Sequence, residues 1–182
     1  GSSIAREADY TIYIKAGFEI AVATTKGYTS QVAIFATLAL DLAKEKGLIS
    51  KELEENIYSD FNNIESLMEQ TIERIDEYKS IAEKIYKKDN LFFIGRGIDS
   101  AVSMEGSLKL KEISYMHSEA YAAGELKHGT ISLIEEGTPV IAIATNNDIL
   151  MLLFKSFLLF IFTPPLSLSG GISFVLFIFF FA

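Results

Sequence analysis

Residues 90–115, NLFFIGRGIDSAVSMEGSLKLKEISY, place an apolar run, a glycine-containing turn and a helical pattern in direct succession. The apolar run at 90–94 predicts a central strand of a parallel sheet, because such strands are buried on both faces. The turn at 95–97 (GRG) leads into a helix expected from about 99 to 115, and a further strand is expected at 139–145 (PVIAIAT). Helices that alternate with short apolar strands predict an α/β fold, with a parallel sheet flanked by helices.

The residues before this stretch predict mainly helices. An alternation of apolar and polar residues at 8–16 (ADYTIYIKA) predicts a strand, and apolar residues three and four apart predict a helix at 26–46. A helical pattern then continues from 50 to 88, with apolar residues along one stripe. Since this is longer than an ordinary helix, we expect two helices with a break near Asn62-Asn63 or further on.

The composition excludes several classes of protein. The 182 residues are 49% hydrophobic and 22% charged, which excludes a disordered or collagen-like chain. A net charge of −8 argues against a general nucleic-acid binder, since phosphate contacts need positive surface. The chain has no cysteine and only two histidines, His117 and His128, so we expect neither a metal site nor another cofactor. A cytoplasmic protein fits these features best.

The composition changes abruptly near the C-terminus. From 149 to 182 the only charged residue is Lys155, and nine of the 14 phenylalanines lie there. The two apolar runs of this tail are each shorter than the roughly 20 residues that a membrane helix needs, so we consider a membrane location unlikely. We favour an aberrant hydrophobic tail, not native to the domain; a membrane anchor, a re-entrant hairpin and a buried core segment stay open.

Three charged residues of the expected helix at 99–115 could carry chemistry. Glu105, Lys109 and Glu112 are spaced i, i+4 and i+7, so they share one face of the helix. Two carboxylates beside an ammonium could perform acid–base work, because burial raises the pKa of a glutamate and a nearby lysine lowers it. The same spacing is also typical of simple ion pairs on a solvated surface, and the residues alone leave both interpretations open.

Two loops contain further candidate residues. His128 lies in the segment ELKHG between Gly124 and Gly129, and an imidazole exchanges protons at cellular pH; a plain surface histidine is the alternative. Thr24 and Thr25 precede the expected helix 26–46 and offer hydroxyls for a phosphorylated or polyhydroxy ligand; the alternative is simple helix capping, with Thr25 as the expected N-cap. The GRG turn could bind an anion through its backbone N–H groups, or be only a tight turn.

Three separated segments resemble the isomerase domain of the isomerising glutamine–fructose-6-phosphate aminotransferases, also called glucosamine-6-phosphate synthases. They are EGSLKLKEISYMHSEAYAAGELKHG at 105–129, AGFEIAVATTKGYTSQ at 16–31 and FIGRG at 93–97. The resemblance implies parts of two sugar-isomerase (SIS) subdomains joined by a helical connector. The expected divisions are the C-terminal part of the first subdomain at 1–48, connecting helices at 49–88, the N-terminal part of the second subdomain at 89–148 and the aberrant tail at 149–182.

The resemblance also implies roles for individual residues. Glu112 matches the carboxylate that moves a proton between C1 and C2 of the sugar, with Lys109 and Glu105 as its charged neighbours. His128 matches the histidine credited with opening the sugar ring, which in the family reaches the site of a neighbouring subunit. We therefore expect these four side chains to meet at one pocket, with His128 supplied by a second copy of the chain.

The loop that contacts the sugar is matched by Val22 and Thr24, although the family commonly has serine in place of Thr24. The implied partners are fructose 6-phosphate and glucosamine 6-phosphate, and a homodimer is expected for the intact family. The family's amidotransferase domain, phosphate-binding loop and Schiff-base lysine have no match here, so we expect this chain alone to be inactive. Three alternatives stay open: a non-catalytic SIS module that binds sugar phosphates, a SIS-type isomerase or deglycase that works without glutamine, and a purely structural or membrane-attached fragment.

Overall fold

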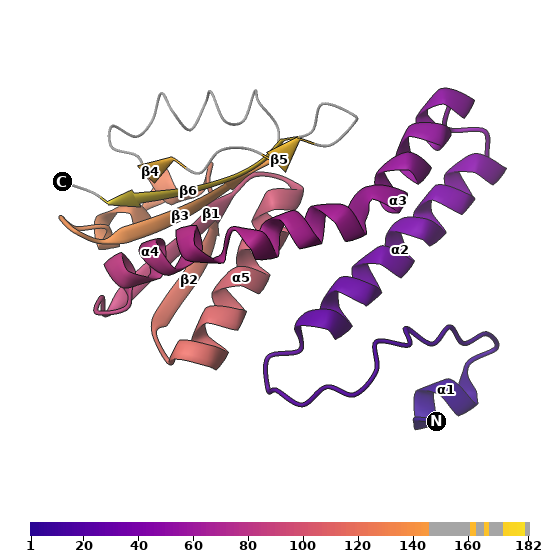
Figure 1. Ribbon diagram of the computed structural model, residues 1–182, viewed down its shortest axis with the longest axis horizontal. Coiled ribbons are helices and arrows are strands. Elements are labelled where there is room, and N and C mark those ends of the chain that lie inside the picture. The colour runs from indigo at the N-terminus through magenta and orange to yellow at the C-terminus, as the bar shows by residue number, and fades with distance from the viewer. Residues whose placement is uncertain (146–160, 163–165, 168–172, 181–182) are drawn as a thin grey trace. The chain divides into compact units, whose positions relative to one another are not determined.

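The computed structural model describes residues 1–145 and, further along the chain, the short segments 161–162, 166–167 and 173–180 (Figure 1). It divides into two compact units, Gly1–Glu54 and Glu55–Ala182. The part of the chain that carries the predicted sheet lies in the second unit.

The first unit is helical. It contains α1 (Ser3–Glu7) and the long helix α2 (Thr25–Glu45), which confirms the helix expected at 26–46. The strand expected at 8–16 is wrong, because this segment is irregular and largely exposed, with Tyr10 93% accessible. Among the described residues no strand lies beside it, and a single strand cannot satisfy its backbone hydrogen-bonding groups.

The end of α2 shows why the helix stops where it does. Gly47 adopts a positive φ of 65°, and the N–H of Leu48 donates to the carbonyl of Ala43 at 2.8 Å. This is the glycine-terminated arrangement that satisfies the last carbonyls of a helix. The next helix begins just beyond, where the Ser50 hydroxyl accepts a hydrogen bond from the N–H of Leu53 at 3.1 Å.

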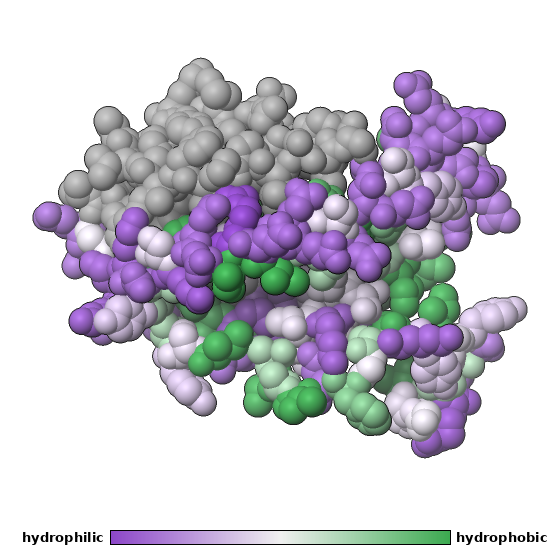
Figure 2. Space-filling model, in the orientation of Figure 1, coloured by the Kyte–Doolittle hydropathy of each residue, from purple (hydrophilic) through white to green (hydrophobic). Residues whose placement is uncertain are grey.

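The long helical pattern is two helices, as expected. Helix α3 (Lys51–Glu73) begins in the first unit and continues into the second, and α4 (Ile75–Ile85) follows it. The break lies at Arg74, further on than Asn62-Asn63, and the Arg74 guanidinium pairs with the Glu77 carboxylate at 2.7 Å. Hydrophilic side chains predominate along the visible surface of α4 (Figure 2).

The sheet has a parallel centre, as the sequence predicts. Its order is β2-β1-β3-β6-β4; β1 pairs in parallel with β2 and β3, and β6 runs antiparallel to β3 (Figure 1). Strand β2 was not predicted, and neither were β4, β5 and β6, which lie in the segments 161–162, 166–167 and 173–180. The strands are β1 (Asn90–Gly95), β2 (His117–Ala122), β3 (Pro139–Ala144), β4 (Ile161–Phe162), β5 (Leu166–Ser167), which pairs with β6, and β6 (Ser173–Phe180).

One face of the sheet is covered by α4 and by α5 (Ile98–Ser114), the helix that follows β1. The core cluster between them buries apolar side chains, each of which stabilises the fold by roughly 1.5–3 kcal/mol. Because β1 is central, its side chains are buried on both faces from its second residue onward. The buried members of the cluster are Ile85, Leu91, Phe93 and Ile141.

The hydrophobic tail is only partly described. Strand β6 pairs with β3 along its length, whereas Lys155 lies outside the described residues. The expectation that 149–182 is an aberrant tail stays a prediction. In the parts of the chain that the structure describes, none of the helices combines the length and apolar character that crossing a membrane requires.

Candidate active site

The sheet order places a switch point at the carboxyl end of β1. From β1 the chain crosses through α5 to β2 on one side, and then returns to β3 on the other side. In open parallel sheets of this kind, ligands bind at the carboxyl ends of strands where the order reverses. The GRG turn at 95–97 and Thr145, just after β3, both lie at this edge.

Gly95 allows the first turn of α5 to lie directly on the end of β1. A Cβ atom built on Gly95 would lie 2.3 Å from the backbone oxygen of Asp99, which is far inside contact distance. Gly97, the N-cap of α5, has a φ of 60°, which side chains rarely tolerate. Both glycines of the turn are therefore required by geometry.

Asp99 joins the start of α5 to the end of β3. Its side chain is 1% exposed, and its two carboxylate oxygens accept hydrogen bonds from the backbone N–H of Thr145 at 3.1 Å and from the Thr145 hydroxyl at 2.9 Å. Hydrogen bonds to a charged acceptor are among the stronger ones in proteins. The edge of the candidate site is thus held by side chains 46 residues apart in the sequence.

The structure brings Glu105, Lys109 and Glu112 together on α5. The Lys109 ammonium lies 2.6 Å from Glu112 Oε2 and 3.5 Å from Glu105 Oε1, and the three side chains are 19–25% exposed. The hydrogen bond that Lys109 donates to Glu112 raises the pKa of Lys109, against the opposing effect of desolvation, with attraction to both carboxylates adding to it. Lys109 therefore stays protonated at neutral pH, where it can orient a carboxylate but cannot accept a proton.

His128 lies apart from these interactions. It ends the short helix η1 (Leu126–His128), its side chain is exposed, and among the described residues it makes no ion pair or side-chain hydrogen bond with Glu105, Lys109 or Glu112. Leu126, 2% exposed, anchors the turn that carries it. The meeting of His128 with the three charged residues stays a prediction that involves a second copy of the chain.

Val22 and Thr24 lie in the first compact unit, in the loop that precedes α2. Val22 is 84% exposed, and Thr24 is the N-cap residue of α2 although its side chain makes no capping hydrogen bond. The Thr24 hydroxyl is thus not used to cap α2. Within residues 1–145, no three His, Asp or Glu side chains are arranged to hold a metal ion.

A second polar row on α5 was not recognised in the sequence. Asp99, Ser103, Ser107 and Lys111 recur every four residues, and this spacing is the signal that could have revealed the row. Ser107 and Ser118 of β2 share a hydrogen bond at 3.0 Å between their hydroxyls, and Ser118 Oγ also donates to the Ser107 carbonyl at 2.9 Å. The row therefore fastens α5 to β2, and Ser103 Oγ is buried without a partner.

Comparisons with known proteins agree with the fold. A SIS domain family model matches residues 84–152. The chain is 54% identical over 149 residues to a glutamine–fructose-6-phosphate aminotransferase [isomerizing] from Clostridium tetani, and 52% identical over 150 residues to the one from Bacillus licheniformis. Each match covers 82% of this chain but only 24% of the relative.

Two solved structures have a similar fold. The C-terminal domain of glucosamine-fructose-6-phosphate aminotransferase from Francisella tularensis superimposes with a TM-score of 0.80 at 37% identity, over 85% of this chain and 44% of that one. A putative phosphosugar isomerase from Clostridium difficile gives a TM-score of 0.67 at 25% identity, over 84% and 44%. These matches confirm the predicted α/β fold with a helix-flanked parallel sheet.

Proposed function

We propose that this chain is part of the isomerase domain of an isomerising glutamine–fructose-6-phosphate aminotransferase, because a SIS domain model matches residues 84–152 and relatives of that name match 82% of the chain. The whole enzyme would convert fructose 6-phosphate and glutamine into glucosamine 6-phosphate and glutamate. Within that enzyme, this chain would act in the ketose-to-aldose step. The 54% identity over 149 residues is the main support.

Within this proposal, Glu112 is the group that carries a proton between C1 and C2 of the sugar. A carboxylate held in one orientation can take a proton from one carbon and return it to the next. The 2.6 Å contact with Lys109 supplies that orientation, and Glu105, at 3.5 Å from the ammonium on its other side, helps to hold the lysine in place. The arrangement of these three residues is the structural observation that carries the proposal.

The remaining residues would act on the rest of the sugar. His128 would open the sugar ring by moving a proton to or from its oxygen, in the site of a neighbouring subunit of a homodimer. Val22 and Thr24 would contact the sugar from the loop before α2. The exposed His128 ring and the absence of a capping hydrogen bond from Thr24 are compatible with these roles.

The first test is an assay of the purified chain with fructose 6-phosphate and glutamine. Because the chain spans 24% of the length of its relatives, we expect no glucosamine 6-phosphate. Turnover above a blank reaction would contradict the expectation that this chain is inactive alone.

The second test measures binding of glucosamine 6-phosphate to the chain by saturation-transfer NMR. We expect binding that Glu112→Gln weakens, with Glu83→Gln on the exposed side of α4 as the matched control. Binding that is unchanged in Glu112→Gln would favour the alternative, a non-catalytic SIS module that binds sugar phosphates. A complete lack of binding to hexose phosphates would overturn both.

A further inference from the structure

One side of helix α2 carries an apolar stripe that is open to solvent. Its members follow one another in steps of four and three residues, the spacing that aligns side chains along one seam of a helix. Val32, Phe35 and Leu42 are 48%, 69% and 56% exposed, although residues of these types are usually buried. The α2 stripe consists of Tyr28, Val32, Phe35, Ala39 and Leu42.

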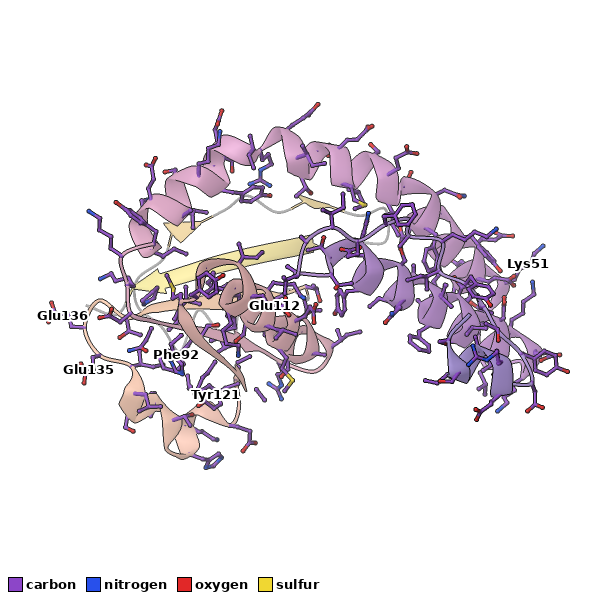
Figure 3. All side chains as sticks on the ribbon, turned by 90° about the horizontal axis from the view of Figure 1, so that it is seen from below. Lys51, Phe92, Glu112, Tyr121, Glu135 and Glu136 are labelled. Atoms are coloured by element: carbon purple, nitrogen blue, oxygen red, sulfur yellow. The ribbon has the colours of Figure 1, made fainter. Side chains whose placement is uncertain are left out.

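The side of α2 that packs within its own unit is a different one. Leu40 is 5% exposed, and Lys44, four residues further on and therefore on the same side, pairs with Glu54 of α3. Helix α3 begins at Lys51, so this ion pair closes the turn between the two helices (Figure 3). Leu40 and Gly27 are the only buried residues of α2. The α2 stripe is therefore left uncovered by the contact with α3.

The composition of α2 favours contact with another apolar surface. Between Gly27 and Ala43 the only charged residue is Asp41, which lies outside the α2 stripe. A helix with one side in water normally carries charged and polar side chains on that side. A continuous apolar face in their place is typical of an interaction surface.

We propose that the α2 stripe pairs with the same stripe of a second copy of this chain. Steps of four and three residues let the side chains of one helix fit into the spaces between those of another. The stripe extends seven residues to either side of Phe35. A two-fold axis at Phe35 therefore pairs the helices antiparallel, with Phe35 against its own equivalent and Tyr28 of each copy close to Leu42 of the other.

Charge and area both favour a second copy as the occupant. The stripe has no charge that would select a charged partner, whereas it is complementary to itself. Its exposed side chains leave on the order of 500 Å² on each copy, so pairing would bury about 1,000 Å², the lower limit for a specific interface. The pairing would supply the second copy that the role proposed for His128 requires, but it is argued from α2 alone.

The test is sedimentation velocity of the whole chain at increasing concentration. We expect a monomer–dimer equilibrium with a dissociation constant in the micromolar range. Phe35→Glu and Phe35→Lys each place two like charges at the two-fold axis and should each weaken dimerisation about tenfold or more. An equimolar mixture of the two variants places opposite charges at the axis and should restore dimerisation. Thr37→Glu, at an exposed residue outside the stripe, is the matched control and should leave dimerisation unchanged.

The mixture also separates loss of the contact from loss of the fold, because two unfolded variants cannot restore a dimer. A chain that stays monomeric throughout the micromolar range would overturn the proposal. Self-association that persists in both Phe35 variants would do so too, because it would assign the contact to another surface, such as the hydrophobic tail. A mixture as monomeric as each variant alone would show that Phe35 does not meet its own equivalent. None of these results bears on sugar binding, which is measured separately on the Glu112 variant.

Discussion

Replacing Gly95 with alanine tests the close contact between the end of β1 and the first turn of α5. The added Cβ would lie 2.3 Å from the oxygen and 2.4 Å from the carbonyl carbon of Asp99, and 2.6 Å from the nitrogen of Ser100, where ordinary contact begins at 3.4 Å. All three atoms belong to the backbone of α5, so no side-chain rotation relieves the clash. The start of the helix must move away from β1, and the bonds between Asp99 and Thr145 must lengthen or break.

Two effects lower the free energy of unfolding of this variant. Overpacking of a tight site costs about 1–3 kcal/mol, and weakened hydrogen bonds to the buried Asp99 carboxylate cost about 1.5–3 kcal/mol. We expect Gly95→Ala to lower the free energy of unfolding by about 3 kcal/mol, which lowers the urea midpoint by roughly 1–3 M.

The measurement is urea unfolding followed by circular dichroism, with Gly124→Ala as the matched control. Gly124 is exposed, and a Cβ built on it meets no atom within 4 Å. We expect its midpoint to stay close to that of the unsubstituted chain. Equal midpoints for the two variants would refute the close contact, because they would mean that α5 does not begin against the end of β1.

Two further predictions concern the contact between α5 and β2. Ser118→Ala removes both hydrogen bonds of a buried hydroxyl and should lower the free energy of unfolding by about 1–3 kcal/mol, measured by urea unfolding. Ser103→Ala removes a buried hydroxyl that has no partner and should leave the free energy of unfolding unchanged or raise it. Equal losses of unfolding free energy in the two variants would contradict this. The hydrogen bond to Glu119, with burial and charge repulsion adding to it, raises the pKa of Tyr121 above 10.0. The stability that this contact gives the folded state is therefore complete below pH 10.0 and is lost as the pH rises through the raised pKa. Glu119→Gln should bring the Tyr121 pKa back towards 10.0 in an NMR titration of the tyrosine rings. An unchanged pKa would show that Glu119 is not the cause.

The local elements that the sequence predicted correctly share one property: their signals are contained within a short stretch of chain. The apolar run of β1 and the helical period of α5 each follow from side chains a few residues apart. The trio of Glu105, Lys109 and Glu112 follows in the same way, because helical spacing alone puts the three on one face. Their ion pairing is thus a consequence of local geometry.

The wrong and missing predictions depend instead on contacts between residues that are distant in the sequence. The alternating pattern at 8–16 is that of a strand, yet a strand also needs a neighbour, and none of the described strands supplies one. Strand β2 was missed because its sequence, HSEAYA, is not apolar and becomes a strand only by pairing with β1. The hydrogen bonds of Ser107 and Lys111 with Ser118 likewise form only because α5 packs against β2.

By itself, the sequence of this protein determined the fold class, the central strand, the main helices and the charged face of α5, since periodicity and helix-ending residues act over a few positions. Only the tertiary structure decided that Asp99 binds Thr145, that Gly95 accommodates a helix backbone, and that Ser118 bonds Ser107. Such contacts join residues distant in the chain, and their energies depend on distances and burial that exist only after the elements have packed.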